Sequence, residues 1–147
     1  MSAWEYAGEL ILALLVSVLL FSFAPRAVLH EHLCSLRTDL MLILGIALGI
    51  GATVWVGFFA LLGGEFGAWL RKKNEASHYS LALAAPIFSY LLGFLLLLFT
   101  ACLESSWLTR MNVLVLTYDL INFITMIRNV NGVVRLWQTW EQQGRPL

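Results

Sequence analysis

Charged side chains are scarce in this sequence. They make up 12% of the 147 residues, against 60% for hydrophobic residues, and the mean hydropathy is +0.81. Soluble globular domains carry about 25% charged residues, so this composition excludes an ordinary soluble domain and indicates an integral membrane protein. The formal net charge is zero, which argues against general nucleic-acid binding.

Motifs for catalysis are missing as well. There is no HExxH, no GxSxG and no phosphate-binding glycine loop. Each segment outside the apolar runs has about 20 residues or fewer, which is too short for a soluble catalytic domain. His30 and His32 are two positions apart and do not share a helix face, so a metal site would need ligands from elsewhere. We expect no enzymatic activity, no cofactor and no bound metal.

Four apolar runs dominate what is present. A helix of about 20 apolar residues crosses the ~30 Å core of a bilayer, and residues 40–64 and 76–103 contain no Asp, Glu, Lys or Arg. The first run is not a secretory signal, because two glutamates and no basic residue precede it. The sequence predicts one all-α domain over residues 1–147, an integral membrane four-transmembrane-helix bundle. Its helices are expected at residues 6–29, 40–64, 78–103 and 110–128, with a polar connection over residues 26–39.

The tail after the fourth run, residues 129–147, has a pattern of its own. Val130, Val133, Val134 and Trp137 form an apolar stripe opposite Arg135 and Gln138. This pattern predicts an amphipathic C-terminal helical extension that lies on the membrane surface or packs with its copies.

Basic residues set the expected orientation. With four spans, the N-terminus, the second connection and the tail lie on one side, which holds six of the nine basic residues. The other side holds Arg26, Arg37 and Arg110. Basic residues concentrate on the cytoplasmic side of membrane proteins. We therefore expect a multi-pass membrane protein with both termini in the cytoplasm.

The two cysteines, Cys34 and Cys102, both fall on the outer side in this topology. An oxidising outer compartment would allow a disulfide between them, within or between subunits. Two free thiols are the alternative.

A stripe of small residues runs along the second helix. Gly45, Gly49, Thr53 and Gly57 are each four positions from the last, so they lie one above the other on one face. Such a stripe lets another backbone approach closely, which is how helices pack in lipid. It predicts either a packing seam inside one subunit or an oligomer seam or pore wall.

Asp119 is the candidate residue for chemistry in the fourth helix. A carboxylate at this depth costs several kcal/mol unless it is protonated, paired or facing water. The polar side chains that accompany it on or beside one face are Tyr118, Asn122, Thr125 and Asn129. The functional interpretation is a pore lining in which Asp119 forms a cation-attracting ring in an oligomer, and a proton relay is a second. The structural alternative is a protonated Asp119 hydrogen-bonded to Ser89 or Tyr90 of a neighbouring helix.

Arg71, Lys72 and Lys73 form the most basic cluster of the chain. Such a cluster fixes topology. Docking of a regulatory partner, an anionic nucleotide or a lipid headgroup is a second role that it could have.

Several features of the second half of the chain occur in a definite order. A small-residue helix end precedes the basic cluster, then follow an acidic and an aromatic residue, a Leu- and Phe-rich run over residues 90–102, and a polar tail. The residues are Ala60, Leu61, Leu62, Gly63, Arg71, Lys72, Lys73, Glu75, Tyr79, Trp140, Glu141, Gln142 and Gln143. This order resembles the RexB family of phage-encoded exclusion proteins. The resemblance implies an inner-membrane, ion-conducting protein that depolarises an infected cell and stays closed until a cytoplasmic sensor partner signals.

Three functions therefore remain open from the sequence. The first is a homo-oligomeric gated ion channel of phage exclusion or abortive infection, with membrane lipids as its surroundings. The second is a structural or accessory subunit of a larger inner-membrane complex, in which Asp119 and the small residues only dock the chain. The third is a small proton-coupled transporter, which a single central carboxylate and the absence of an inverted repeat weaken.

Overall fold

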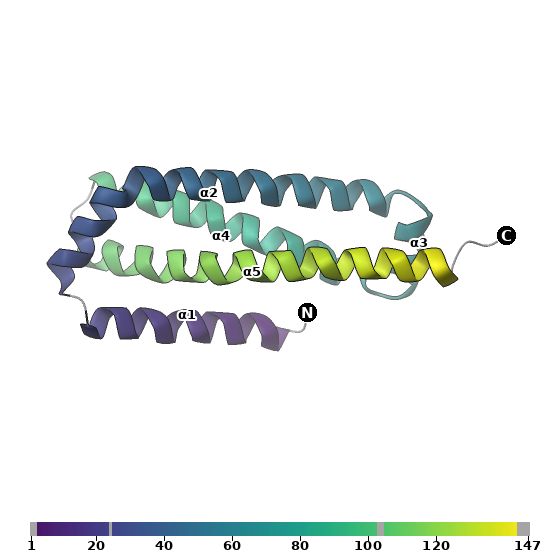
Figure 1. Cartoon of the computed structure of the whole chain (residues 1–147), viewed down its shortest axis with the longest axis horizontal. Coiled ribbons are helices and arrows are strands. Elements are labelled where there is room, and N and C mark those ends of the chain that lie inside the picture. Colours follow the sequence, from purple (N-terminus) through teal and green to yellow (C-terminus); the bar gives the residue numbers. More distant parts are fainter. Residues whose placement is uncertain (1–2, 24, 103–104, 144–147) are drawn as a thin grey trace.

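The computed structural model describes residues 3–23, 25–102 and 105–143, and the side chains of residues 7–23, 25, 27–100, 105 and 107–142. These residues form five α-helices (Figure 1). The helices are α1 (Ala3–Phe23), α2 (Arg26–Leu62), α3 (Glu65–Lys72), α4 (Ala76–Cys102) and α5 (Ser106–Gln143). The all-α prediction is confirmed for the described part of the chain.

Three of the helices are long and apolar enough to cross a membrane, by length and composition. Their candidate spans are Ala27–Leu62 in α2, Ala76–Thr100 in α4 and Trp107–Gln142 in α5, and α1 contributes a shorter apolar helix, Ala7–Phe23. The sides of these helices that face away from the bundle carry many exposed Leu, Ile, Val and Phe side chains. Such surfaces are suited to lipid and not to water.

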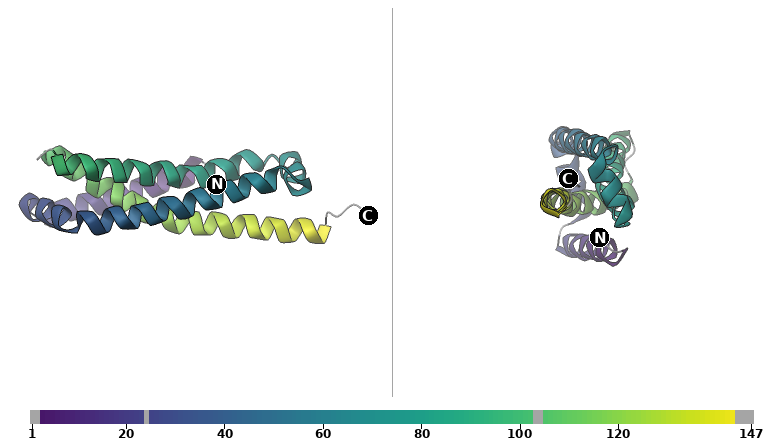
Figure 2. Two further views of the ribbon diagram at one scale, coloured as in Figure 1. Left: turned by 90° about the horizontal axis from the view of Figure 1, so that it is seen from above. Right: turned by 90° about the vertical axis from the view of Figure 1, so that its right-hand side faces the viewer.

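The bundle is built around α2, α4 and α5, which lie side by side along most of their length (Figure 2). α1 packs principally against α5, on the side away from α2 (Figure 1). One apolar core lies between α2, α4 and α5 and contains Leu44, Ala47, Tyr90, Leu97 and Met126. α4 and α5 therefore make the central seam of the molecule, and α1 covers that seam from outside.

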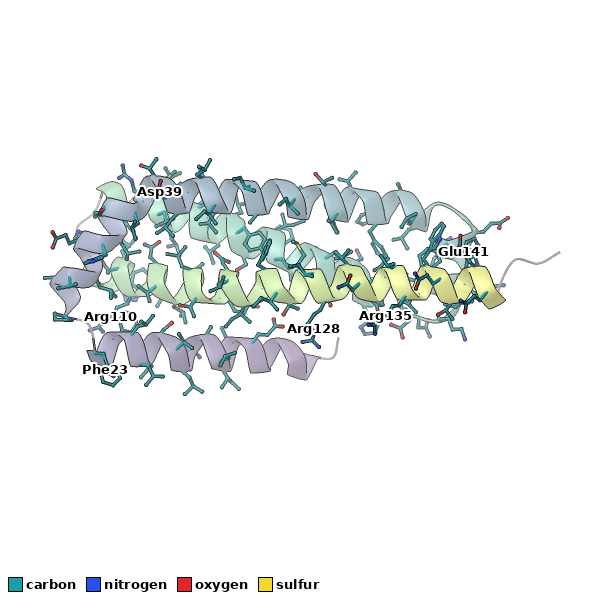
Figure 3. All side chains as sticks on the ribbon, viewed as in Figure 1. Phe23, Asp39, Arg110, Arg128, Arg135 and Glu141 are labelled. Atoms are coloured by element: carbon teal, nitrogen blue, oxygen red, sulfur yellow. The ribbon has the colours of Figure 1, made fainter. Side chains whose placement is uncertain are left out.

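The sequence-based prediction of the first connection is wrong. The first helix ends at Phe23 instead of residue 29, and Pro25 stands at the N-cap of α2 with ψ 140°. From Arg26 to Leu44 the sequence contains neither glycine nor proline, so nothing interrupts the helix. The expected loop over residues 26–39 is instead the first part of α2, which crosses the end of the bundle and bends near Asp39 (Figure 3).

The second connection contains a helix that the sequence reasoning missed. After Gly63 and Gly64 the chain reverses, and α3 folds back against the end of α2. A Cβ atom at Gly67 would overlap the backbone of Leu62, so α3 can approach α2 this closely only with glycine at that position. Asn74, with φ 58°, then turns the chain towards α4.

The predicted C-terminal extension is helical, since α5 continues without a break to Gln143. Its apolar side packs on α3 and on the ends of α2 and α4, rather than lying free on a membrane surface. Phe66 of α3 has its ring centroid 5.0 Å from that of Trp137 and 5.8 Å from that of Trp140. We call this second core the aromatic cap; its buried members are Phe58, Phe66, Leu70, Leu83, Val133 and Trp140.

Candidate functional site

A row of polar side chains runs along the buried side of α5. We call this row, with its partners on α1 and α4, the polar seam. The spacings between its members are 7, 3, 3 and 4 residues, which keep them on one side of a helix. The α5 members are Asn112, Asp119, Asn122, Thr125 and Asn129, and all five are buried.

Asp119 lies at the centre of the polar seam and is 4% exposed. The hydroxyl of Ser89 on α4 donates a hydrogen bond to its Oδ1, whereas its Oδ2 is buried without a partner among the described residues. The carboxylate fits against α4 because residue 93 is glycine, and a Cβ there would overlap Oδ2. The bond to Ser89 is the contact that the structural alternative for Asp119 predicted. Tyr90, the other partner considered, is also buried, and its hydroxyl has no hydrogen-bond partner among the described residues.

A second carboxylate enters the polar seam from α1. The hydroxyl of Thr125 donates a hydrogen bond to Glu9 Oε1, while Glu9 Oε2 is buried with no partner in the described part of the chain. Sequence reasoning missed Glu9 because it was assigned to the polar entry of the first helix. The available signal was its place inside the apolar stretch Ala7–Phe23, where an ionisable side chain is costly and usually functional.

Asn129 replaces a backbone hydrogen bond that α4 lacks at Pro86. Pro86 lies inside α4 and has no N–H, so the carbonyl of Ala82, four residues earlier, loses its helical donor. The amide Nδ2 of Asn129 donates to that carbonyl at 3.2 Å. The hydrogen bond that Pro86 removes from α4 is thus supplied by α5.

The remaining two members of the polar seam differ from each other. Asn112 Nδ2 donates to the Thr100 hydroxyl and to the carbonyls of Leu96 and Leu108, the latter at 3.0 Å, and so joins the end of α4 to the start of α5. Asn122 is fully buried, and neither its Nδ2 nor its Oδ1 has a partner among the described residues. An unpaired buried amide costs about 1–3 kcal/mol. The buried Asn122 side chain therefore lowers the free energy of unfolding.

Two grooves lie on either side of the hydrogen-bonded pair Ser89–Asp119 in the polar seam. The first lies between α2 and α5, has a volume of about 500 Å³ and is lined in part by Asp119. The second lies between α1, α4 and α5, has a volume of about 360 Å³ and is lined in part by Ser89 and Tyr118. The hydrogen-bonded pair Ser89–Asp119 therefore separates two cavities that open on different sides of the α4–α5 seam.

The predicted lining residues are thus brought together, but inside one subunit. Asp119, Asn122, Thr125 and Asn129 face α4 and α1, and Tyr118 is half-buried in the wall of the second groove. None of the five is presented on the outer surface of the bundle in the way that a ring around a shared central pore requires.

The stripe of small residues on α2 faces outward. A Cβ atom at Gly45, Gly49 or Gly57 would meet nothing within 4 Å, and the exposed Thr53 donates its hydroxyl hydrogen to the Gly49 carbonyl at 2.8 Å. The contact inside the subunit uses a neighbouring face, where a Cβ at Gly51 would lie 3.1 Å from Ile87 Cγ1. The stripe is therefore open to another helix.

The basic cluster is exposed at the end of α3, and part of it has a structural role. Arg71 Nη1 donates to the carbonyl of Leu62 at 2.8 Å, which satisfies the C-terminal end of α2. Lys73 Nζ lies 5.9 Å from the centroid of the Trp69 ring. Arg128 and Arg135 of α5 extend the positive charge beyond the end of α1 (Figure 3).

The cysteines and histidines form no site within the described residues. Cys34 is exposed, with its Sγ 3.6 Å from His30 Nε2, while the side chain of Cys102 lies outside the described residues. The disulfide between them stays a prediction. No group of three or more His, Cys, Asp or Glu side chains that could hold a metal ion occurs in the described part of the chain.

The fold and composition define the class of this protein as an all-α bundle with three helices suited to cross a membrane. Comparison with known proteins takes the identification no further, because no protein family, no curated protein and no solved structure matches the chain.

Proposed function

We propose that this protein is a small, gated, ion-conducting protein of the bacterial inner membrane and that ions pass along the polar seam of each subunit. The observation that carries the proposal is the seam itself, in which five polar side chains follow one side of α5 through the apolar bundle. Polar and ionisable side chains at membrane depth are costly, face the bundle interior and commonly mark ion or proton paths.

The chemistry of the seam favours cations or protons over anions. Its charged members are two carboxylates, Glu9 and Asp119, and its neutral members offer hydroxyl and amide oxygens. Asp119 Oδ2, Glu9 Oε2 and Asn122 Oδ1 are buried without a partner among the described residues, so their lone pairs are free to hold a cation or a water molecule. The close packing of α1 and α4 against the seam corresponds to a path that is mostly closed at rest and opens briefly, so that a flux assay over many copies of the protein records its basal openings.

The proposed topology has four spans: α2, α4 and α5, together with α1, which is the shortest of the four helices. Both termini lie in the cytoplasm. The excess of basic residues on that side supports this orientation, because Arg71, Lys72 and Lys73 follow α2 at the end where α5 also terminates. The open stripe of Gly45, Gly49, Thr53 and Gly57 supports assembly into a homo-oligomer.

Gating is assigned to the aromatic cap. α5 is one continuous helix from Asn112 in the seam to Trp140 in the cap, so a partner that displaces the cap also displaces the seam. The basic cluster on α3 offers a receiving surface for a cytoplasmic regulatory partner or an anionic nucleotide. Together with the resemblance to the RexB family, these features support the proposal of a role in phage exclusion or abortive infection, in which opening would depolarise the cell.

A structural or accessory subunit of a larger membrane complex is the second candidate. The observation in its favour is that α1 packs principally against α5 and that the small-residue stripe is unpartnered, so two surfaces are ready to receive other chains. A proton-coupled transporter is the third, favoured by the presence of two carboxylates in one seam. Neither an accessory subunit nor a proton-coupled transporter requires ions to flow passively through the protein.

Ion flux into proteoliposomes tests the proposal. We expect the purified full chain to carry cation or proton flux at least about tenfold above protein-free liposomes, and Asp119→Asn to lower that flux about tenfold or more because it removes the central charge. The matched control is Asp39→Asn, an exposed aspartate at the bend of α2 (Figure 3), which leaves flux unchanged. Absence of flux in the wild type, or equal flux in both variants, contradicts the proposal.

A further inference from the structure

The groove between α2 and α5 has the properties of a ligand site. Its volume of about 500 Å³ lies within the ~300–1,000 Å³ range of small-molecule pockets. Nine of its eleven lining residues are aliphatic or Phe, and the other two are Asp119 and Tyr90. The aliphatic and Phe lining residues are Leu40, Ile43, Leu44, Ile46, Ala47, Ile50, Leu116, Leu120 and Phe123. An apolar wall with a few polar groups is the usual composition of such pockets.

The mouth of this groove opens towards lipid. Ile43 and Ile46 on α2 and Leu120 on α5 line it and are 60%, 55% and 67% exposed on the outer face of the bundle. These positions belong to the candidate spans of their helices. A ligand would therefore enter from the bilayer and must be soluble in it.

The floor of the groove carries a carboxyl group that has no basic partner among the described residues. Asp119 and Tyr90 are 4% and 1% exposed, and Asp119 Oδ2 and the Tyr90 hydroxyl have no hydrogen-bond partner among the described residues. Ser89 occupies the other carboxylate oxygen. A Cβ at Gly93 would touch both Asp119 Oδ2 and Leu44 Cδ1, so the free oxygen lies close to Leu44, which also lines the groove. A buried carboxylate without a counter-charge favours a cation beside it.

We propose that the α2–α5 groove binds a lipid-soluble ammonium compound, with an apolar chain in the groove and one primary ammonium against Asp119 and Tyr90. A primary ammonium has three donors, enough to reach Asp119 Oδ2 and the Tyr90 oxygen together. A plain acyl chain leaves both oxygens unpaired, and an anionic headgroup is repelled by the carboxylate. This site goes beyond the proposed conduction and does not depend on it, because binding is measured without ion flow.

The test uses the full chain in phosphatidylcholine nanodiscs and two matched probes. One is a twelve-carbon primary amine with a photoreactive diazirine in its chain, and the other is the corresponding alcohol. Dodecylamine and dodecanol serve as competitors. We expect the amine to label α2 and α5 at the groove, and dodecylamine to compete at least about tenfold better than dodecanol, since charge-assisted hydrogen bonds are about twice as strong as neutral ones.

Variants locate the two parts of the site. Asp119→Asn should remove the preference for amine over alcohol, whereas Glu9→Gln, a buried carboxylate outside the groove, should retain it. Ile46→Trp fills the mouth from an exposed position and should lower labelling at least fivefold, while Ile11→Trp, equally exposed on α1, should not. Equal competition by dodecylamine and dodecanol in the wild type, or an unchanged preference in Asp119→Asn, overturns the proposal. Labelling that Ile46→Trp leaves intact also overturns it.

Discussion

At the scale of the residue, the polar seam divides into groups that stabilise the bundle and groups that do not. Asn112 and Asn129 make hydrogen bonds that complete α4, at its C-terminal end and at its proline turn. Asn122, one oxygen of Glu9 and one oxygen of Asp119 remain without partners in the described part of the chain. Buried polar groups that gain nothing from the fold are costly, and they are therefore the stronger candidates for function.

The assignment of Asn129 to the proline turn predicts a specific coupling. Asn129→Ala should lower the free energy of unfolding by about 1–2 kcal/mol, because the Ala82 carbonyl loses its donor in an apolar interior. In a Pro86→Ala background the same change should cost much less, since the backbone N–H of residue 86 then supplies the bond. A double-mutant cycle of unfolding in mixed micelles measures the coupling. Asn131→Ala, an exposed asparagine on α5, is the control, and equal costs in both backgrounds contradict the assignment.

At the scale of the element, the cap is a small folded unit attached to the membrane bundle. α3 fits between α2 and α5 because it turns back directly after Gly63 and Gly64, and the indole and phenyl rings of Phe66, Trp137 and Trp140 then meet. The ends of α2, α4 and α5 are held together there. The cap thus fixes the relative height of the three long helices, on which the alignment of the polar seam depends.

Gly67 is the position on which the cap depends most. Gly67→Ala should destabilise the cap by about 1–3 kcal/mol, because the added Cβ overlaps the backbone of Leu62, which cannot rotate away. The expected observation is a red shift of tryptophan emission and faster proteolysis after α2. Gly64→Ala is the matched control, since its Cβ would be 3.8 Å from the nearest atom and its φ is −97°. Identical emission and proteolysis in the two variants would show that α3 does not pack as described.

Much of the helical content could be predicted from the sequence, because apolar runs such as residues 40–64 and 76–103 leave no other element for a membrane. The helix boundaries could not be predicted where a polar stretch of sequence was interpreted as a loop. Residues 26–39 are polar but contain no helix breaker and continue α2. α3 is short, and its close contact with α2 through Gly67 is a tertiary feature without a local sequence signal.

The candidate site could be predicted on α5 but not across helices. The spacing of Asp119, Asn122, Thr125 and Asn129 places them on one face of a helix, and Ser89 was among the partners considered for Asp119. Which face of α5 meets α4 and α1 depends on packing, so Glu9 and the role of Asn129 at Pro86 emerged only from the structure. The orientation of the α2 stripe was open for the same reason, and the structure directs it outward.

At the scale of the whole molecule, the polar seam and the stripe of small residues on α2 are on different surfaces. The seam lies between α1, α4 and α5, while the stripe that is open to another subunit lies on the outer face of α2. The proposed conduction inside each subunit and the proposed assembly between subunits can therefore be tested separately. A pore shared at the centre of an oligomer would be lost when the subunits separate, whereas a path inside each subunit would persist.

Gly49→Leu separates these two arrangements. A Cβ there meets nothing within 4 Å inside the subunit, so we expect an outward-pointing leucine to leave the fold intact while it blocks close approach of a second α2. We expect the wild type to form one closed oligomer by particle mass in mild detergent, after subtraction of the detergent, and Gly49→Leu to form a smaller particle. Gly8→Leu, on the equally open face of α1, keeps the wild-type mass. Ion flux per milligram of Gly49→Leu protein should remain within about twofold of the wild type, because its path is intact. Loss of flux together with loss of the oligomer would instead place the pore between the subunits, and a monomeric wild type without flux would assign the stripe to docking in a larger complex.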